Sequence, residues 1–286
     1  MKNKTQAVCL ILLSSFFFCM MSLIVKISST DVSTMQQVFF RNLVSLFIIG
    51  IFIYRKGISF FGEKKYQIPL CARSFFGFLG VIMLFYATAN ARQADVALLN
   101  RTSPIWVTIF AILILKEKIS KIQVPVVLLC LMGAFIAMRP SFDSDFLPLL
   151  LAVGSAFCTG LAYTMISFCK GKVNPLTVVF HFSFFSTVCA FFFMLPTFVM
   201  PTWKGLAMLV LIGIFAAGGQ ITITYAYQKS PASEISIYDY TGIVISALLG
   251  YFVLSEKLTI PTIAGGVLIV GSALWSFLYN RRGASI

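Results

Sequence analysis

The chain has 286 residues, of which 59% are hydrophobic and only 11% charged, and its mean hydropathy is +0.95. A soluble domain of this length could not bury so much apolar surface, so the composition predicts an all-α integral membrane protein. The formal net charge of +13 comes from basic residues scattered over short connections, which argues against nucleic acid as a partner.

Ten apolar segments follow one another along the chain, each close to the ~20 residues that cross a bilayer as a helix. We predict ten transmembrane helices at 7–28, 34–54, 68–90, 93–115, 121–138, 147–169, 174–196, 203–228, 231–254 and 261–279. Because the connections are short, helices that follow each other in sequence should be antiparallel neighbours.

The second half of the chain repeats the first. Residues 86–120 align without a gap with residues 225–259, a shift of 139 residues that also pairs Asn100 with Asp239. The same shift carries the third to fifth segments onto the eighth to tenth. We therefore predict two five-helix repeats, residues 1–139 and 140–286, that together form one transport domain. An odd number of spans per repeat inverts the second repeat in the membrane, as in many transporters.

Lysine and arginine residues outside the apolar cores fall mostly in alternate connections. Fourteen lie on the side of the amino terminus and five on the other side. This bias predicts that both termini are cytoplasmic. We expect a multi-pass protein of the bacterial cytoplasmic (inner) membrane, either a monomer or a homodimer.

Several kinds of chemistry are not expected from this sequence. It contains one histidine, seven isolated cysteines and no glycine-rich nucleotide loop. These features argue against a metal site, a disulfide framework, a cofactor or ATP hydrolysis. Besides the small-molecule substrate and the lipid bilayer, the expected partner is a coupling proton or a counter-substrate.

Polar side chains inside the predicted spans are the binding-site candidates, because each is costly in lipid unless it faces a cavity, a partner or water. Asn100 and Arg101 lie about eight residues into the fourth span, roughly 12 Å deep and so close to mid-membrane. Asp239 and Tyr240 hold the matching place in the ninth span. The candidate substrate-binding residues are Arg41, Asn42, Tyr86, Asn100, Arg101, Trp106, His181, Gln220, Tyr225, Tyr238, Asp239 and Tyr240.

Two interpretations of the charged residues remain open. Arg101 and Asp239 either form an ion pair that only joins the two halves, or the arginines bind an anionic group while Asp239 tunes the site or meets an amine. His181 is either a satisfied interior side chain or a proton carrier. Pro104 should bend the fourth span by freeing the carbonyl of Asn100.

The chain resembles the EamA-type branch of the drug/metabolite transporter superfamily. The resemblance covers essentially the whole chain and is carried by a Leu-x-Glu-Lys signature after the fourth and ninth spans. The matching residues are Leu115, Glu117, Lys118 and Ser120, then Leu254, Glu256, Lys257 and Thr259, with Phe39, Phe40, Arg41, Arg73, Gly133, Arg139 and Pro140 elsewhere. The resemblance implies a central cavity lined by spans 1–4 and 6–9, with spans 5 and 10 at the periphery.

These observations predict a secondary, ATP-independent transporter that moves a small polar metabolite by alternating access. An organic anion or an amino acid is the first choice of substrate. A nucleoside-like or cofactor metabolite, or a drug exported by the same fold, is the alternative within transport. A lipid-modifying membrane enzyme is the alternative from another class, but it would need catalytic groups clustered at one interface, so we expect no enzyme.

Overall fold

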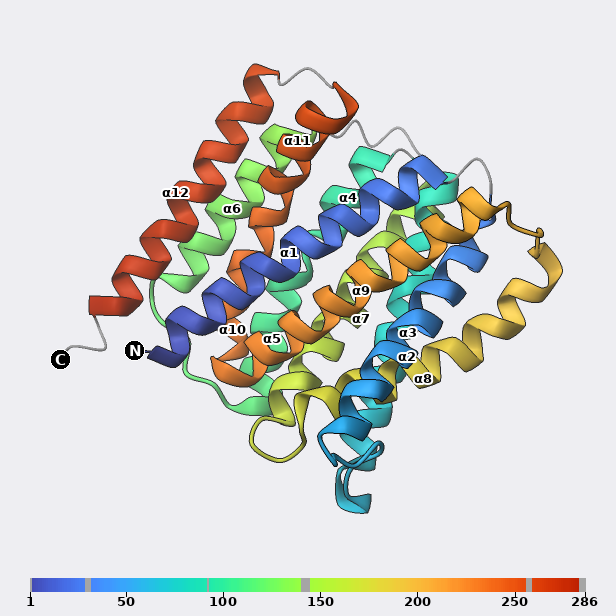
Figure 1. The fold of residues 1–286 in the computed structure, drawn as a ribbon. Coiled ribbons are helices and arrows are strands. Elements are labelled where there is room, and N and C mark those ends of the chain that lie inside the picture. Colours follow the sequence, from blue (N-terminus) through green and yellow to red (C-terminus); the bar gives the residue numbers. More distant parts are fainter. Residues whose placement is uncertain (1, 29–31, 92, 140–144, 256–258, 283–286) are drawn as a thin grey trace.

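The computed structural model describes residues 2–28, 32–91, 93–139, 145–255 and 259–282, and within them every element is a helix (Figure 1). Nine stretches of this part of the chain are long and apolar enough to cross a membrane, and 123–138 forms a shorter apolar helix. The predicted all-α membrane fold with ten spans is therefore confirmed. The elements are α1 (Lys2–Ser28), α2 (Thr34–Arg55), η1 (Lys64–Tyr66), α3 (Gln67–Asn90), α4 (Gln93–Asn100), α5 (Ser103–Leu115), α6 (Gln123–Met138), α7 (Phe146–Phe168), α8 (Pro175–Met194), η2 (Leu195–Thr197), α9 (Trp203–Lys229), α10 (Ala232–Ile235), η3 (Ser236–Tyr240), α11 (Thr241–Leu254) and α12 (Ile260–Arg282).

The fourth and ninth spans are both broken near their middle, where the sequence predicted single helices over 93–115 and 231–254. The fourth consists of α4 and α5, separated by a turn at Arg101 and Thr102, and the ninth of α10, η3 and α11. At each break a threonine hydroxyl donates to the carbonyl three residues earlier, at 2.6 Å in both cases. These threonines, Thr102 and Thr241, are related by the 139-residue repeat.

The two repeats also end these spans in the same way. Lys116 and Ser255 both have φ of 55°, in the left-handed region. Each donates its backbone N–H to the carbonyl five residues earlier, which stops the helix sharply. The structure describes Glu117 of the first signature, whereas Glu256 and Lys257 of the second lie outside the described residues.

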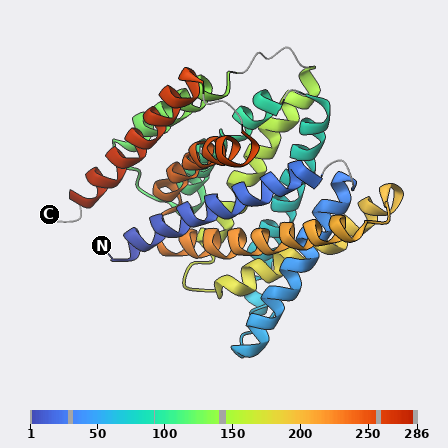
Figure 2. The ribbon, with the colours of Figure 1, turned by 45° about the horizontal axis from the view of Figure 1, so that its top comes forward.

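The two halves interlock. Helix α1 packs along α9, and the repeat-related pair α7 and α3 packs in the same way (Figures 1 and 2). Ser14 donates its hydroxyl to the carbonyl of Gly219 at 3.0 Å, and Ser155 donates to Gly80 at 2.8 Å. Such serine and glycine contacts hold helices together in lipid, where apolar burial gives no preference for protein over bilayer. The exact repeat boundary stays a prediction, because residues 140–144 lie outside the described chain.

Helices α6 and α12 pack against each other at one edge of the bundle (Figure 2). Their backbones approach closely at two glycines. A Cβ atom on Gly133 would lie 2.8 Å from the carbonyl oxygen of Gly265, and a Cβ atom on Gly265 would clash with the carbonyl oxygen of Gly133. This pair therefore depends on the absence of side chains at the crossing.

The end of the bundle that holds the start of α1 is tied together by polar contacts between the halves. The Glu117 carboxylate accepts from the backbone N–H of Ala232 at 2.9 Å, and from the N–H and hydroxyl of Ser233 at 3.1 and 2.7 Å. It thereby caps α10, which has no side-chain cap of its own because Pro231 precedes it. Beside it, Lys4 pairs with Glu234 at 2.5 Å.

The glycine crossing predicts a sharp difference between two alanine substitutions in α12. Gly265→Ala should lower the thermal midpoint of the purified protein, because the new methyl group meets the α6 backbone. Gly271→Ala is the matched control, since nothing lies within 4 Å of its Cβ position. Equal midpoints for the two variants would contradict the packing described for α6 and α12.

The Glu117 cap predicts that Glu117→Ala destabilises the protein by about 1–2 kcal/mol, because it leaves two backbone donors of α10 without partners. Glu63→Ala is the control, since Glu63 is an exposed carboxylate paired only with Lys65. Thermal or denaturant unfolding in detergent measures both. A loss of stability in Glu63→Ala as large as in Glu117→Ala would argue against a structural cap.

Candidate functional site

An ion pair joins the two broken spans. Arg101 lies in the turn between α4 and α5, and Asp239 lies in η3. The Arg101 Nη1 atom is 3.6 Å from Asp239 Oδ2 and also donates to the Asp239 backbone carbonyl at 3.1 Å. The side chains remain 26% and 21% exposed, so the pair is not sealed inside the protein. The arginine thus binds both a charged group and a backbone acceptor at the break in the opposite repeat.

A glycine makes room for this arginine. A Cβ atom on Gly242 would lie 3.3 Å from both terminal nitrogens of Arg101. The carbonyl of Gly242 accepts from the Cys19 thiol of α1 at 3.3 Å. The start of α11 is therefore held between the guanidinium group and α1, which fixes the position of the break.

A second arginine, Arg73 of α3, is 2% exposed. Its Nη2 atom donates to Gln220 Oε1 at 3.0 Å, and its guanidinium group lies over the Phe182 ring, 4.1 Å from the centroid. A Cβ atom on Gly77 would clash with it, so glycine at that position admits the arginine. The candidate set did not include Arg73. In the sequence, Arg73 is a charged residue within an apolar helix, and Gly77 follows it four residues later. This pattern could have indicated that the arginine is accommodated inside the bundle.

His181 of α8 lies beside Arg73 and has partners for both ring nitrogens. The Ser74 hydroxyl is 2.7 Å from Nδ1, and the Cys71 sulfur is 3.9 Å from Nε2. Within the described residues, no carboxylate lies within ion-pairing distance of His181. This geometry matches the satisfied interior histidine, which was one of the two interpretations.

Arg41 of α2 lies within electrostatic range of Arg73 and of Tyr163 on α7. Its Nε atom is buried and has no hydrogen-bond partner in the described structure. Tyr163 in turn lies within electrostatic range of Arg101 and Asp239 as well as both other arginines. Its ring packs against that of Tyr227 at 4.9 Å between centroids. Tyr163 is therefore within electrostatic range of both charged groups, and no pattern in the sequence distinguished it from the other tyrosines.

Several candidates make contacts away from these charges. Asn42 donates to the Val38 carbonyl of its own helix at 2.8 Å, and Asn100 donates to the Ser155 hydroxyl at 3.1 Å. Trp106 packs against the rings of α5 and α7 and lies against Gly160. These three side chains fasten helices to one another, and nothing in their geometry directs them to the arginines.

The remaining tyrosine candidates are spread over the bundle. Tyr86 is 45% exposed, whereas Tyr238 and Tyr240 are buried. Tyr240 packs with α6 and α12, and Tyr225 packs with residues of α2 and α8. The structure thus brings together Arg41, Arg101, His181, Gln220 and Asp239 around Arg73 and Tyr163, with Tyr240 within electrostatic range of Arg101 and Asp239. It leaves the other tyrosine candidates outside this group.

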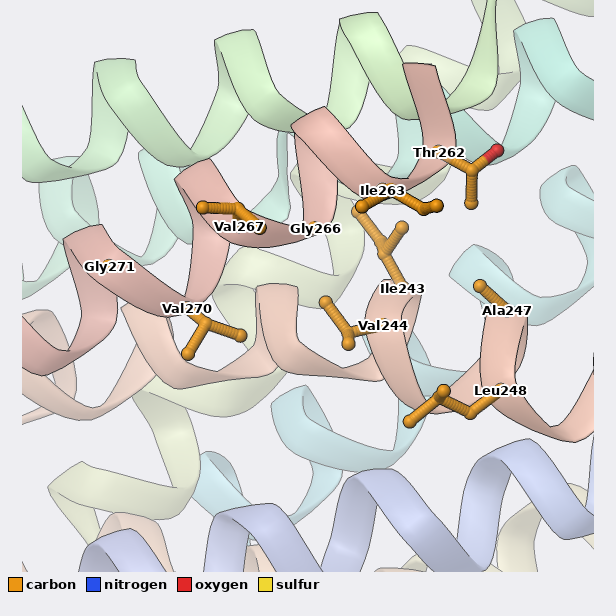
Figure 3. Close-up of a pocket in the computed structure, with 10 residues that line it drawn as sticks. All are labelled: Ile243, Val244, Ala247, Leu248, Thr262, Ile263, Gly266, Val267, Val270 and Gly271. Atoms are coloured by element: carbon orange, nitrogen blue, oxygen red, sulfur yellow. The ribbon is translucent and has the colours of Figure 1, made fainter. Parts of the chain in front are cut away.

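The described part of the chain contains no candidate metal site. No group of three or more histidine, cysteine, aspartate or glutamate residues is placed to hold an ion among these residues. A groove of about 560 Å³ between α11 and α12 is lined almost entirely by aliphatic side chains (Figure 3). Its lining suits lipid tails rather than a polar solute.

Comparison with known proteins agrees with the fold and the membrane setting. The EamA-like transporter family matches residues 5–139 and again residues 146–278. The chain is 30% identical over 268 residues to the pseudopaline exporter CntI of Pseudomonas aeruginosa, covering 93% of each chain. It is 26% identical to solute carrier family 35 member G1 of Homo sapiens, covering 91% of this chain and 76% of that one.

Two more distant likenesses cover nearly the whole chain. An S-adenosylmethionine uptake transporter of Rickettsia prowazekii is 21% identical over 292 residues, covering 100% of this chain and 97% of that one. A solved crystal structure of another protein superposes with a TM-score of 0.85 at 16% identity, covering 98% and 99% of the chains, and shows the same fold. The chain is a multi-pass membrane transporter and belongs to the EamA-like transporter family.

Proposed function

We propose that this protein is a secondary transporter that moves a small organic anion or amino acid by alternating access. The observation that carries the proposal is the partly exposed Arg101–Asp239 pair at two repeat-related helix breaks. Broken helices with unsatisfied backbone are tolerated at membrane depth only where protein or a polar cavity surrounds them. In transporters built from inverted repeats, such breaks form the substrate site.

Arg101 and Asp239 suit either a zwitterionic solute or a solute with one carboxylate. A guanidinium group binds carboxylates through two parallel hydrogen bonds, and a carboxylate binds an amine. Asp239 already occupies part of the donor capacity of Arg101. The substrate therefore competes with an existing ion pair, which is how binding energy becomes coupled to a change in the packing of the two halves.

Alternating access requires the contacts that join the halves at one end to break when that end opens. Two contacts join the halves at the end of the bundle that holds the start of α1. They are the hydrogen bonds between Glu117 and Ser233 and the ion pair between Lys4 and Glu234. The start of α1 and the end of α12 lie at that same end (Figure 1). With the basic-residue bias, this arrangement supports a cytoplasmic location for both termini and a bacterial inner-membrane protein.

The names of the relatives support a metabolite as substrate. One relative is named for pseudopaline export and another for S-adenosylmethionine uptake. S-adenosylmethionine contains an amino acid group and a nucleoside group. A nucleoside-like metabolite is therefore the second candidate, favoured by the paired rings of Tyr163 and Tyr227.

The proposal predicts that purified protein is stabilised by its substrate and moves it across a vesicle membrane. A thermal-shift screen of amino acids, organic acids and nucleosides should raise the midpoint for a subset rich in carboxylates. Proteoliposome uptake then measures transport of each hit with and without a proton gradient. Hits confined to uncharged nucleosides would favour the second candidate, and lack of transport for every hit would contradict the proposal.

A double substitution distinguishes a substrate site from a structural ion pair at Arg101 and Asp239. If the pair is structural only, each of Arg101→Gln and Asp239→Asn should be destabilising, and the double variant should recover both stability and transport. If the pair serves the substrate, we expect the double variant to fold yet lose most uptake. Arg55→Gln, at the exposed end of α2, is the control for removing a basic residue. A double variant with near-normal uptake would overturn the proposed role.

A further inference from the structure

We propose that the substrate carries a net negative charge and that its excess anionic group binds at Arg41 and Arg73. This inference rests on the proposed transport function and names a second subsite for it, apart from the Arg101–Asp239 pair. It follows from the charges inside the bundle, from the geometry around Arg73 and from the lack, among the described residues, of an ion pair to either arginine.

The arginines inside the described spans are only partly compensated by carboxylates, and the buried carboxylate of Asp95 in α4 has contacts of its own. Arg41, Arg73 and Arg101 carry three positive charges, and Asp239 is the carboxylate that meets one of them. Within the described residues, neither Arg41 nor Arg73 has an ion pair. A charged side chain inside a membrane span is costly unless an opposite charge compensates it, so two such arginines indicate a binding site for an anion.

The two arginines also lie within electrostatic range of each other. They lie close enough for electrostatic repulsion, and both Nε atoms are buried without a hydrogen-bond partner in the described structure. Buried polar atoms are satisfied in the great majority of native structures, and exceptions point to a role that the protein alone does not fulfil. An anion between the guanidinium groups would remove the repulsion and accept hydrogen bonds from both.

Arg73 is held ready for such a ligand. The Phe182 ring packs against its face, Gln220 accepts one hydrogen bond, and Gly77 leaves space for its end. These neighbours are all neutral, so they fix the orientation of the group without cancelling its charge. A preorganised guanidinium group binds a carboxylate with little further loss of side-chain freedom.

Tyr163 relates the two proposed subsites to each other. It lies within electrostatic range of both the arginine subsite and the Arg101–Asp239 pair. A solute that reaches both subsites across this tyrosine presents an anionic group to Arg41 and Arg73, and a carboxylate or an amine to the pair. The structure therefore favours acidic amino acids and dicarboxylates over neutral amino acids and uncharged nucleosides.

Matched acid and amide probes test this inference. L-glutamate against L-glutamine, and succinate against succinamate, differ in one charge at nearly constant shape, and adenosine serves as an uncharged probe. Binding to purified wild-type protein, measured calorimetrically, should be about tenfold or more tighter for the acid of at least one pair, since a hydrogen bond to a charged group is worth ~1.5–3 kcal/mol.

Substitutions then assign the preference to the subsite. Arg41→Gln and Arg73→Gln should bring the acid-to-amide ratio close to one, and Arg73→Lys should restore part of it because the charge is kept without the planar fork. Arg55→Gln, which removes an exposed arginine from the same helix as Arg41, should leave the ratio unchanged. The affinities for acid and amide are measured on the same variant protein and compared as a ratio. A general loss of stability lowers both affinities and therefore does not produce the expected change in the ratio. If Arg73→Gln fails to fold, the acid-to-amide ratios of Arg41→Gln and Arg73→Lys test the subsite instead.

The outcomes separate this inference from the transport function. An equal affinity for acids and amides, or a ratio that survives both glutamine substitutions, overturns the arginine subsite and leaves the transporter proposal intact. Binding of adenosine alone also overturns it. Absence of binding by every probe removes the proposed substrate class, whereas the transport function fails only when no solute from the wider screen is moved into proteoliposomes.

Discussion

The absence of water from the bilayer core is the constraint on which this structure depends. A helix that breaks there must satisfy its freed backbone groups within the protein. Both breaks do so with the same means, a threonine hydroxyl bonded to the carbonyl three residues earlier, at Thr102 and at Thr241. Arg101 adds a bond to the Asp239 carbonyl of the opposite break. The site is thus built where the membrane would otherwise forbid irregular backbone.

Interlocking of the repeats follows from the same constraint. Because lipid tails are as apolar as leucine, helices associate through close packing and polar contacts. The bonds of Ser14 to Gly219 and of Ser155 to Gly80 provide such contacts in symmetric positions. Each repeat therefore contributes helices to the packing of the other, and a shift of one half changes the surroundings of the charged residues in both.

The charged residues fall into two groups with different electrostatic states. Arg101 is neutralised in part by Asp239, while neither Arg41 nor Arg73 has an ion pair among the described residues. A charge that is already paired can be exchanged between partners, whereas an uncompensated charge attracts a ligand of opposite sign. Under the proposed function, the Arg101–Asp239 pair is therefore suited to switching and the Arg41 and Arg73 subsite to recognition, with Tyr163 within electrostatic range of both.

The sequence by itself determined the class of fold and the ten spans, because hydropathy and an internal repeat depend on local order along the chain. The helix breaks were signalled in part by Pro104, but the ninth span has no such residue. Only the tertiary structure paired Arg73 with Gln220, 147 positions away, and carried Glu117 across to α10. These contacts depend on how helices from opposite repeats pack, and packing of this kind leaves no periodic signal in either segment alone.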